Sequence, residues 1–201
     1  MQLIYRILGW VGILVYGALI YEMWRLWSAP TPDDTGRILT LAVMMGFEFI
    51  MVHSGIFMAA FPRKISLFIF VPFYGAFALV FNSMTPGNEI LFLYLGAVFI
   101  RMRFAFSNAT EEEIGANMSM SFLAVVLYFF LIIAFSIGSD HIPELGLTRE
   151  FLTTTNYLNE DTIGGIFTEM PQVSMAMGMV YFGLLAFAEI KVYKLLKPLP
   201  A

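Results

Sequence analysis

The chain has no cysteine among its 201 residues. Disulfide bonds, thiolate metal sites and thiol nucleophiles are therefore excluded. The sequence also lacks glycine-rich phosphate loops, zinc-ligand spacings and basic patches of the kind that bind nucleic acid. We accordingly expect no nucleic-acid partner and no chemistry that depends on a thiol.

Charged residues are scarce as well, at 13% of the chain, against about 25% in a typical soluble domain. Hydrophobic residues make up 59%, and the mean hydropathy is +0.79. Apolar runs of about 20 residues recur along the sequence, which is typical of membrane-spanning helices. We therefore predict an all-α integral membrane protein whose residues 1–201 form a single transmembrane domain.

The apolar segments predict a bundle of about six transmembrane helices, separated by polar, turn-rich breaks such as SAPTPDDTG (28–36) and SMTPGN (83–88). The predicted helices cover residues 3–27, 38–61, 65–82, 89–106, 118–137 and 173–195. We interpret the first of them as a retained anchor helix, because its apolar run is too long for a signal peptide.

The basic residues predict the direction in which the chain crosses the membrane. With the N-terminus inside, three of the eleven face outward, namely Arg25, Arg37 and Arg149. The other eight face the cytoplasm, namely Arg6, Arg63, Lys64, Arg101, Arg103, Lys191, Lys194 and Lys197. The positive-inside rule therefore predicts that both termini are cytoplasmic, and we expect a bacterial inner membrane.

The longest connection, residues 138–172, is predicted to lie outside and to hold a short surface helix. It carries a single arginine against six acidic residues, Asp140, Glu144, Glu150, Glu160, Asp161 and Glu169. Such an acidic face could gather cations at a pore mouth. Alternatively, it reflects only the general avoidance of lysine and arginine by outer loops.

Two ionisable residues, Glu48 and His53, lie inside the apolar segment MMGFEFIMVHSG (44–55). Glu48 is near the midpoint of the predicted helix 38–61, where inserting a carboxylate costs about 2.5–3.5 kcal/mol. It should therefore face other helices or water, on a stripe that it shares with Met44, Met51, Gly55 and Met58. His53 is about 140° around the helix, so we expect the two ionisable side chains not to touch.

This segment has two interpretations. In the first, Glu48 is a proton or cation site, and Met51, His53 and Ser54 extend a polar pathway between helices. In the second, Glu48 and His53 each bond a neighbouring helix and only determine the packing. Similarly, Glu189 near the inner end of the last helix is expected to form an interfacial pair with Arg101 or Arg103.

The sequence gives little support for a cofactor site or for an enzyme. Met175 and Met179 share a helical face and are weak candidates for a copper site, since thioethers suit Cu(I), although methionine is also ordinary packing. His53 alone lies in a span, which leaves only a His/Met pair for haem. Adjacent helical residues point about 100° apart, so His53 cannot activate Ser54 as a nucleophile. We expect no cofactor and no enzyme.

Two functions remain. The first is a small homo-oligomeric channel or transport protein for cations or protons, with Glu48 lining the path. The second is a non-catalytic structural or sensor subunit of a larger membrane complex, which the scarcity of polar residues in the other spans favours. The expected partners are the lipid bilayer and either further copies of the chain or other membrane subunits. Glu48 favours the first function.

Overall fold

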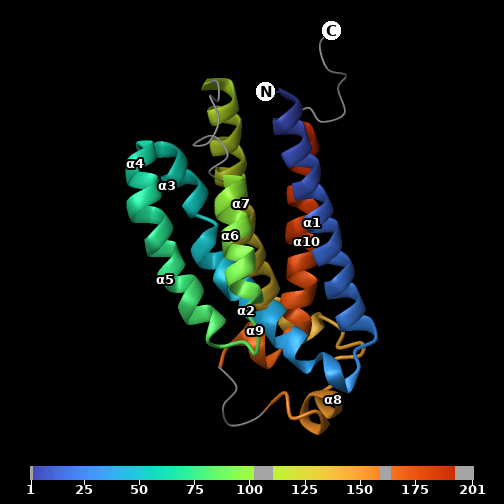
Figure 1. The fold of residues 1–201 in the computed structure, drawn as a ribbon. Helices are drawn as coiled ribbons and strands as arrows, with labels where there is room; N and C mark the ends of the chain where they lie inside the picture. The colour runs from blue at the N-terminus through green and yellow to red at the C-terminus, as the bar shows by residue number, and fades with distance from the viewer. Residues whose placement is uncertain (1, 102–110, 159–163, 193–201) are drawn as a thin grey trace.

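A computed structural model describes residues 2–101, 111–158 and 164–192 (Figure 1). The structure is 83% helical, and no strand occurs in the described residues, so the prediction of an all-α fold is confirmed. The elements in chain order are α1 (Gln2–Ser28), η1 (Pro32–Asp34), α2 (Thr35–Met51), α3 (Ser54–Ala60), α4 (Arg63–Ile65), η2 (Ser66–Phe70), α5 (Val71–Asn82), α6 (Glu89–Arg101), α7 (Glu111–Ile137), η4 (Ser139–His141), α8 (Arg149–Thr154), α9 (Ile166–Glu169) and α10 (Pro171–Val192).

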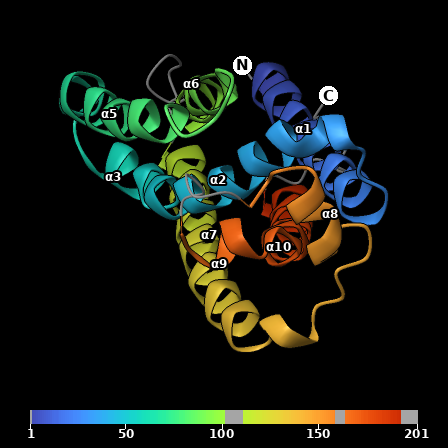
Figure 2. The ribbon, with the colours of Figure 1, turned by 90° about the horizontal axis from the view of Figure 1, so that it is seen from below.

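The long helices stand side by side and alternate in direction along the chain (Figure 1). Helix α10 is central, since it packs along α1 and also contacts α2, α7 and α9. Helices α5 and α6 form a neighbouring pair, and α3 contacts α7. The start of α1 and the end of α10 lie at the same end of the bundle, while α8 and α9 lie at the opposite end (Figure 2).

Three segments of the described chain are long and apolar enough to cross a membrane, namely Pro32–Phe57, Ile114–Ile137 and Pro171–Lys191. Two shorter apolar helical segments, Ser66–Asn82 and Glu89–Val98, accompany them. Length and composition therefore support a membrane protein.

The predicted helix 38–61 is interrupted in the structure. Helix α2 ends at Met51, and α3 begins at Ser54 after a turn at Val52 and His53. The Ser54 hydroxyl donates a hydrogen bond of 2.7 Å to the Met51 carbonyl across this turn. That bond provides a polar partner for a backbone carbonyl at the point where the regular helix is interrupted.

Two further helix boundaries differ from those predicted. Helix α7 includes residues 111–117, which lie before the predicted start at 118. The predicted helix 65–82 contains the π-helix η2, which directly precedes the helix start at Val71-Pro72. Proline has no backbone N–H, and a local change of hydrogen-bond pattern accommodates it.

Part of the connection 138–172, around Pro143 and Gly146, folds back against the far end of α1. The indole nitrogen of Trp27 donates to the Pro143 carbonyl at 2.9 Å, and the Gly146 amide donates to the Trp27 carbonyl at 2.9 Å. Leu147 and Leu152 of this connection are buried in the core. The connection, with α8 in it, therefore covers one end of the bundle.

A network of charges joins α1 to α2. Arg25 donates to both carboxylate oxygens of Glu22 and to both of Asp34, with the shortest contacts at 2.9 Å. Asp34 also accepts hydrogen bonds from the Thr31 amide and hydroxyl, and Arg37 lies 3.3 Å from Glu22. Bidentate pairs of this kind are stronger than isolated surface pairs.

Replacing Asp34 by alanine should lower the free energy of unfolding by about 1–3 kcal/mol, because Arg25 and Thr31 lose their common acceptor. Thermal unfolding of the full chain in detergent measures this as a lower Tm. Asp33→Ala is the matched control, since Asp33 is the exposed neighbour of Asp34. Equal Tm values for the two variants would contradict the role of the network.

Candidate functional site

Glu48 of α2 is hydrogen-bonded to a tyrosine of the central helix. The hydroxyl of Tyr181 in α10 donates to Glu48 Oε1 at 2.8 Å. Tyr128 of α7 packs edge-on against Tyr181, with ring centroids 5.5 Å apart, and donates its own hydroxyl to the Met45 carbonyl at 2.5 Å. Two buried tyrosines from α7 and α10 therefore contact α2 at nearly the same height.

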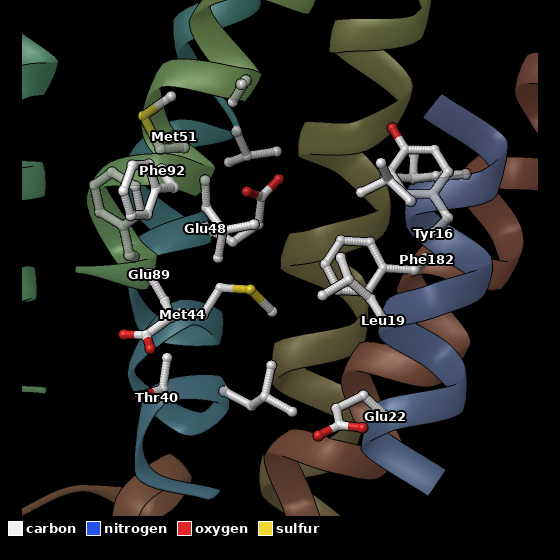
Figure 3. A pocket seen from close by; sticks show the side chains of 18 of the residues that line it. Tyr16, Leu19, Glu22, Thr40, Met44, Glu48, Met51, Glu89, Phe92 and Phe182 are labelled. Atoms are coloured by element: carbon white, nitrogen blue, oxygen red, sulfur yellow. The ribbon is translucent and has the colours of Figure 1, made fainter. Parts of the chain in front are cut away.

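Glu48 also lines a cleft of about 860 Å³ between α1, α2, α6, α7 and α10, which we call the central cleft (Figure 3). Met44, Glu48, Met51 and Phe92 lie on one side of it, and Tyr16, Leu19 and Phe182 face them from the other. The remaining lining is also largely apolar, and it includes Val15, Leu41, Phe47, Leu93, Ala97, Met120, Ala124 and Leu185.

Carboxylates are spread along the length of the central cleft. Glu22 of α1, Asp33 of η1 and Glu89 of α6 line it, together with Glu48 of α2 and Glu189 of α10. Figure 3 shows Glu22, Glu89 and Glu48 at different heights. Glu189 is eight positions beyond Tyr181, which is about 12 Å along the helix axis. Among the described residues that line the cleft, one basic side chain, Arg37, accompanies these five acidic ones.

Glu189 is buried at a close approach of α1 and α10. It is 6% exposed, and a Cβ atom added to Gly12 of α1 would lie 3.0 Å from Glu189 Oε2. The predicted partner Arg103 lies outside the described residues, as does the side chain of the other, Arg101. Gly12 of α1 is one close neighbour of the Glu189 carboxylate.

The other predicted pathway residues are brought together only in part, since the Ser54 hydroxyl is bonded to the Met51 carbonyl. Met51 lines the central cleft with Glu48, whereas neither His53 nor Ser54 is among the described lining residues. His53 packs between Phe49 and Phe129, with ring centroids 6.2 and 5.7 Å away. The turn after Met51 interrupts the helical stripe; Val52 in that turn still lines the cleft, whereas His53 lies among aromatic rings.

The candidate copper ligands lie in packed surroundings. Met175 is fully buried, and Met179 is partly buried against the same core. A Cβ added to Gly178, between them on α10, would lie 2.6 Å from the sulfur of Met23. Within the described ranges, no group of three or more His, Asp or Glu residues is placed to hold a metal ion.

Several residues of the site were missed by the sequence analysis, notably Tyr181, Phe182 and Tyr16. Tyr181 carried a usable signal, because a tyrosine hydroxyl in the middle of an apolar span needs a buried partner. Phe182 and Tyr16 carried none, since aromatic residues are common throughout these helices.

Comparisons of the chain with protein-family models, with curated proteins and with solved structures found no match. The function therefore has to be inferred from the chemistry and geometry of the central cleft.

The variant Tyr181→Phe removes the donor to Glu48 and keeps the ring that packs on Tyr128. The lost hydrogen bond to a carboxylate should cost about 1.5–3 kcal/mol, which would appear as a lower Tm in detergent. Tyr21→Phe is the control, because Tyr21 is 67% exposed on α1. If both variants unfold at the wild-type temperature, the Tyr181–Glu48 bond contributes nothing to stability.

Proposed function

We propose that this protein is a small, non-catalytic membrane protein that moves cations or protons across the bilayer as a channel or transport protein. The observation that carries the proposal is the Glu48 carboxylate, which lines the central cleft between the helices. Ionisable groups within membrane spans are costly and commonly mark ion pathways or proton relays. The hydrogen bond from Tyr181 lowers the free-energy cost of burying the carboxylate. The carboxylate still lines the cleft.

The distribution of charge along the central cleft supports a positive substrate. Glu22, Asp33 and Glu89 line one part of it and Glu189 another, so a cation would meet carboxylates on its way to Glu48 and beyond. Mostly apolar walls strengthen such electrostatic attraction, because they keep the local dielectric constant low.

The cleft lies within one chain, so the proposed path runs through each subunit rather than between subunits. Homo-oligomerisation would then arrange several such paths side by side. Large apolar side chains on the outside of α7, such as Phe130 (69% exposed) and Ile137 (80%), are suited to contacts with lipid or with a neighbouring copy.

For the membrane topology we propose six crossings, made by α1, by α2 with α3, by η2 with α5, by α6, by α7 and by α10. The alternating directions of these helices support this count (Figure 1). The uneven distribution of basic residues supports cytoplasmic termini and a bacterial inner membrane.

The absence of native cysteine allows a direct test of this topology. A membrane-impermeant maleimide added outside intact cells should label Thr154→Cys in α8 and should not label Lys64→Cys in α4. After lysis, both variants should be labelled. Labelling of Lys64→Cys alone in intact cells would show that the orientation is inverted.

The variant Glu48→Gln should reduce flux at least tenfold. The purified chain is reconstituted into liposomes, and proton, Na⁺ and K⁺ flux is followed under an imposed potential. Glutamine keeps the shape of the side chain and an acceptor for the Tyr181 hydroxyl, so the loss would report the missing charge. Glu144→Gln is the control, because Glu144 lies exposed in the outer connection.

Wild-type flux in Glu48→Gln would contradict the role given to this carboxylate. If the wild-type protein carries neither these three ions nor an organic cation, the proposal fails as a whole. The better assignment would then be the non-catalytic structural or sensor subunit of a larger membrane complex, which the exposed apolar face of α7 favours.

A further inference from the structure

The central cleft is much larger than a bare ion requires. Its volume is about 860 Å³, whereas a water molecule occupies about 30 Å³ in the liquid. Pockets for small organic molecules are about 300–1,000 Å³ in volume, are mostly apolar and contain a few polar groups that orient the ligand. The size and lining of this cleft match that description.

The surroundings of Glu48 do not resemble an inorganic ion site. Hard cations such as Ca²⁺ take about six to eight oxygen ligands. The described residues contain no group of three or more acidic or histidine side chains suited to a metal ion. The neighbours of Glu48 in the cleft wall are instead thioethers and hydrocarbon groups, including Met44, Met51 and Phe92.

The wall that faces Glu48 is aromatic. Tyr16 of α1 and Phe182 of α10 stack with ring centroids 5.7 Å apart and an interplanar angle of 21°, and both line the cleft (Figure 3). Aromatic faces attract organic cations, and methionine side chains adapt to ligands of irregular shape.

The charges of the lining favour a cation over an anion. Among the described residues, five carboxylates line the cleft against one guanidinium, Arg37. One of the five, Glu22, is paired with Arg37 at 3.3 Å and with Arg25 at 2.9 Å. An organic anion would therefore meet repulsion along the cleft, and the described lining offers it no basic partner beside Glu48.

We propose that the central cleft takes an apolar organic cation, of the onium type, whose charge pairs with Glu48 while its apolar groups lie against Tyr16, Phe182 and the two methionines. This inference rests on the proposed function, because it assigns a substrate class to the same cleft and the same carboxylate.

The test uses two ions of nearly the same shape and opposite charge, tetraphenylphosphonium and tetraphenylborate. The full chain is placed in nanodiscs, and equilibrium binding of each ion is measured after subtraction of its partition into empty nanodiscs. Tetraphenylphosphonium should bind saturably at one site per chain, and tetraphenylborate should show no saturable binding.

Three variants identify the site. Glu48→Gln should weaken tetraphenylphosphonium binding at least tenfold, whereas Glu48→Asp, which keeps the charge, should retain most of it. The control Glu144→Gln should bind as the wild type does. Circular dichroism and size-exclusion profiles verify that each variant is folded. If Glu48→Gln does not fold, the comparison of Glu48→Asp with the wild type still tests the site.

The inference is overturned if tetraphenylphosphonium shows no saturable binding, if tetraphenylborate binds equally well, or if folded Glu48→Gln binds like the wild type. Its failure is distinguishable from failure of the proposed function. Proton or metal-ion flux without tetraphenylphosphonium binding would leave the proposed function standing and refute the substrate class. Saturable, Glu48-dependent binding without flux of any cation, tetraphenylphosphonium included, would support the site and refute transport.

Discussion

The structure depends on one requirement, that a carboxylate within an apolar helix bundle must have a polar partner. Glu48 obtains it from the Tyr181 hydroxyl of α10 at 2.8 Å. Tyr128 extends this contact, because its ring packs on Tyr181 and its hydroxyl bonds the Met45 carbonyl. The polar contacts of Glu48 therefore coincide with the contacts that hold α2, α7 and α10 together. A change at this position affects both the packing and the lining of the cleft.

The cleft is maintained by contacts at its margins rather than across it. At one end, the Arg25 network joins α1 to η1 and neutralises much of the local negative charge. Beyond Glu48, Gly12 permits α1 to approach α10 closely beside Glu189. These two contacts join α1 firmly to α2 and to α10. The rings of Tyr16 and Phe182 are thereby held in position opposite Glu48.

Composition and hydrophobic periodicity were sufficient to predict an all-α fold and to single out Glu48, because both depend on local sequence. The predicted stripe of Met44, Glu48, Met51, Gly55 and Met58 holds in part, because its first three residues line the cleft and the helix is interrupted after Met51. The hydrogen-bond partner of Glu48 was not predictable from the sequence, since Tyr181 is 133 positions away in the chain. The turn at Val52 and His53 was also missed, because neither glycine nor proline marks it. The predicted polar pathway also included His53 and Ser54, which are not among the described residues that line the cleft.

The two interpretations of Glu48 offered by the sequence are compatible in the structure. Its bond to Tyr181 is a packing interaction of the kind expected between membrane helices. Packing alone, however, does not account for the space beside it, because protein interiors are normally filled to crystal-like density. A carboxylate needed only to join two helices would be surrounded by packed side chains. Glu48 instead lines an opening of about 860 Å³ whose other charged groups are mostly carboxylates. That combination of a bonded carboxylate and adjacent unfilled space is what a binding site for a positive substrate requires.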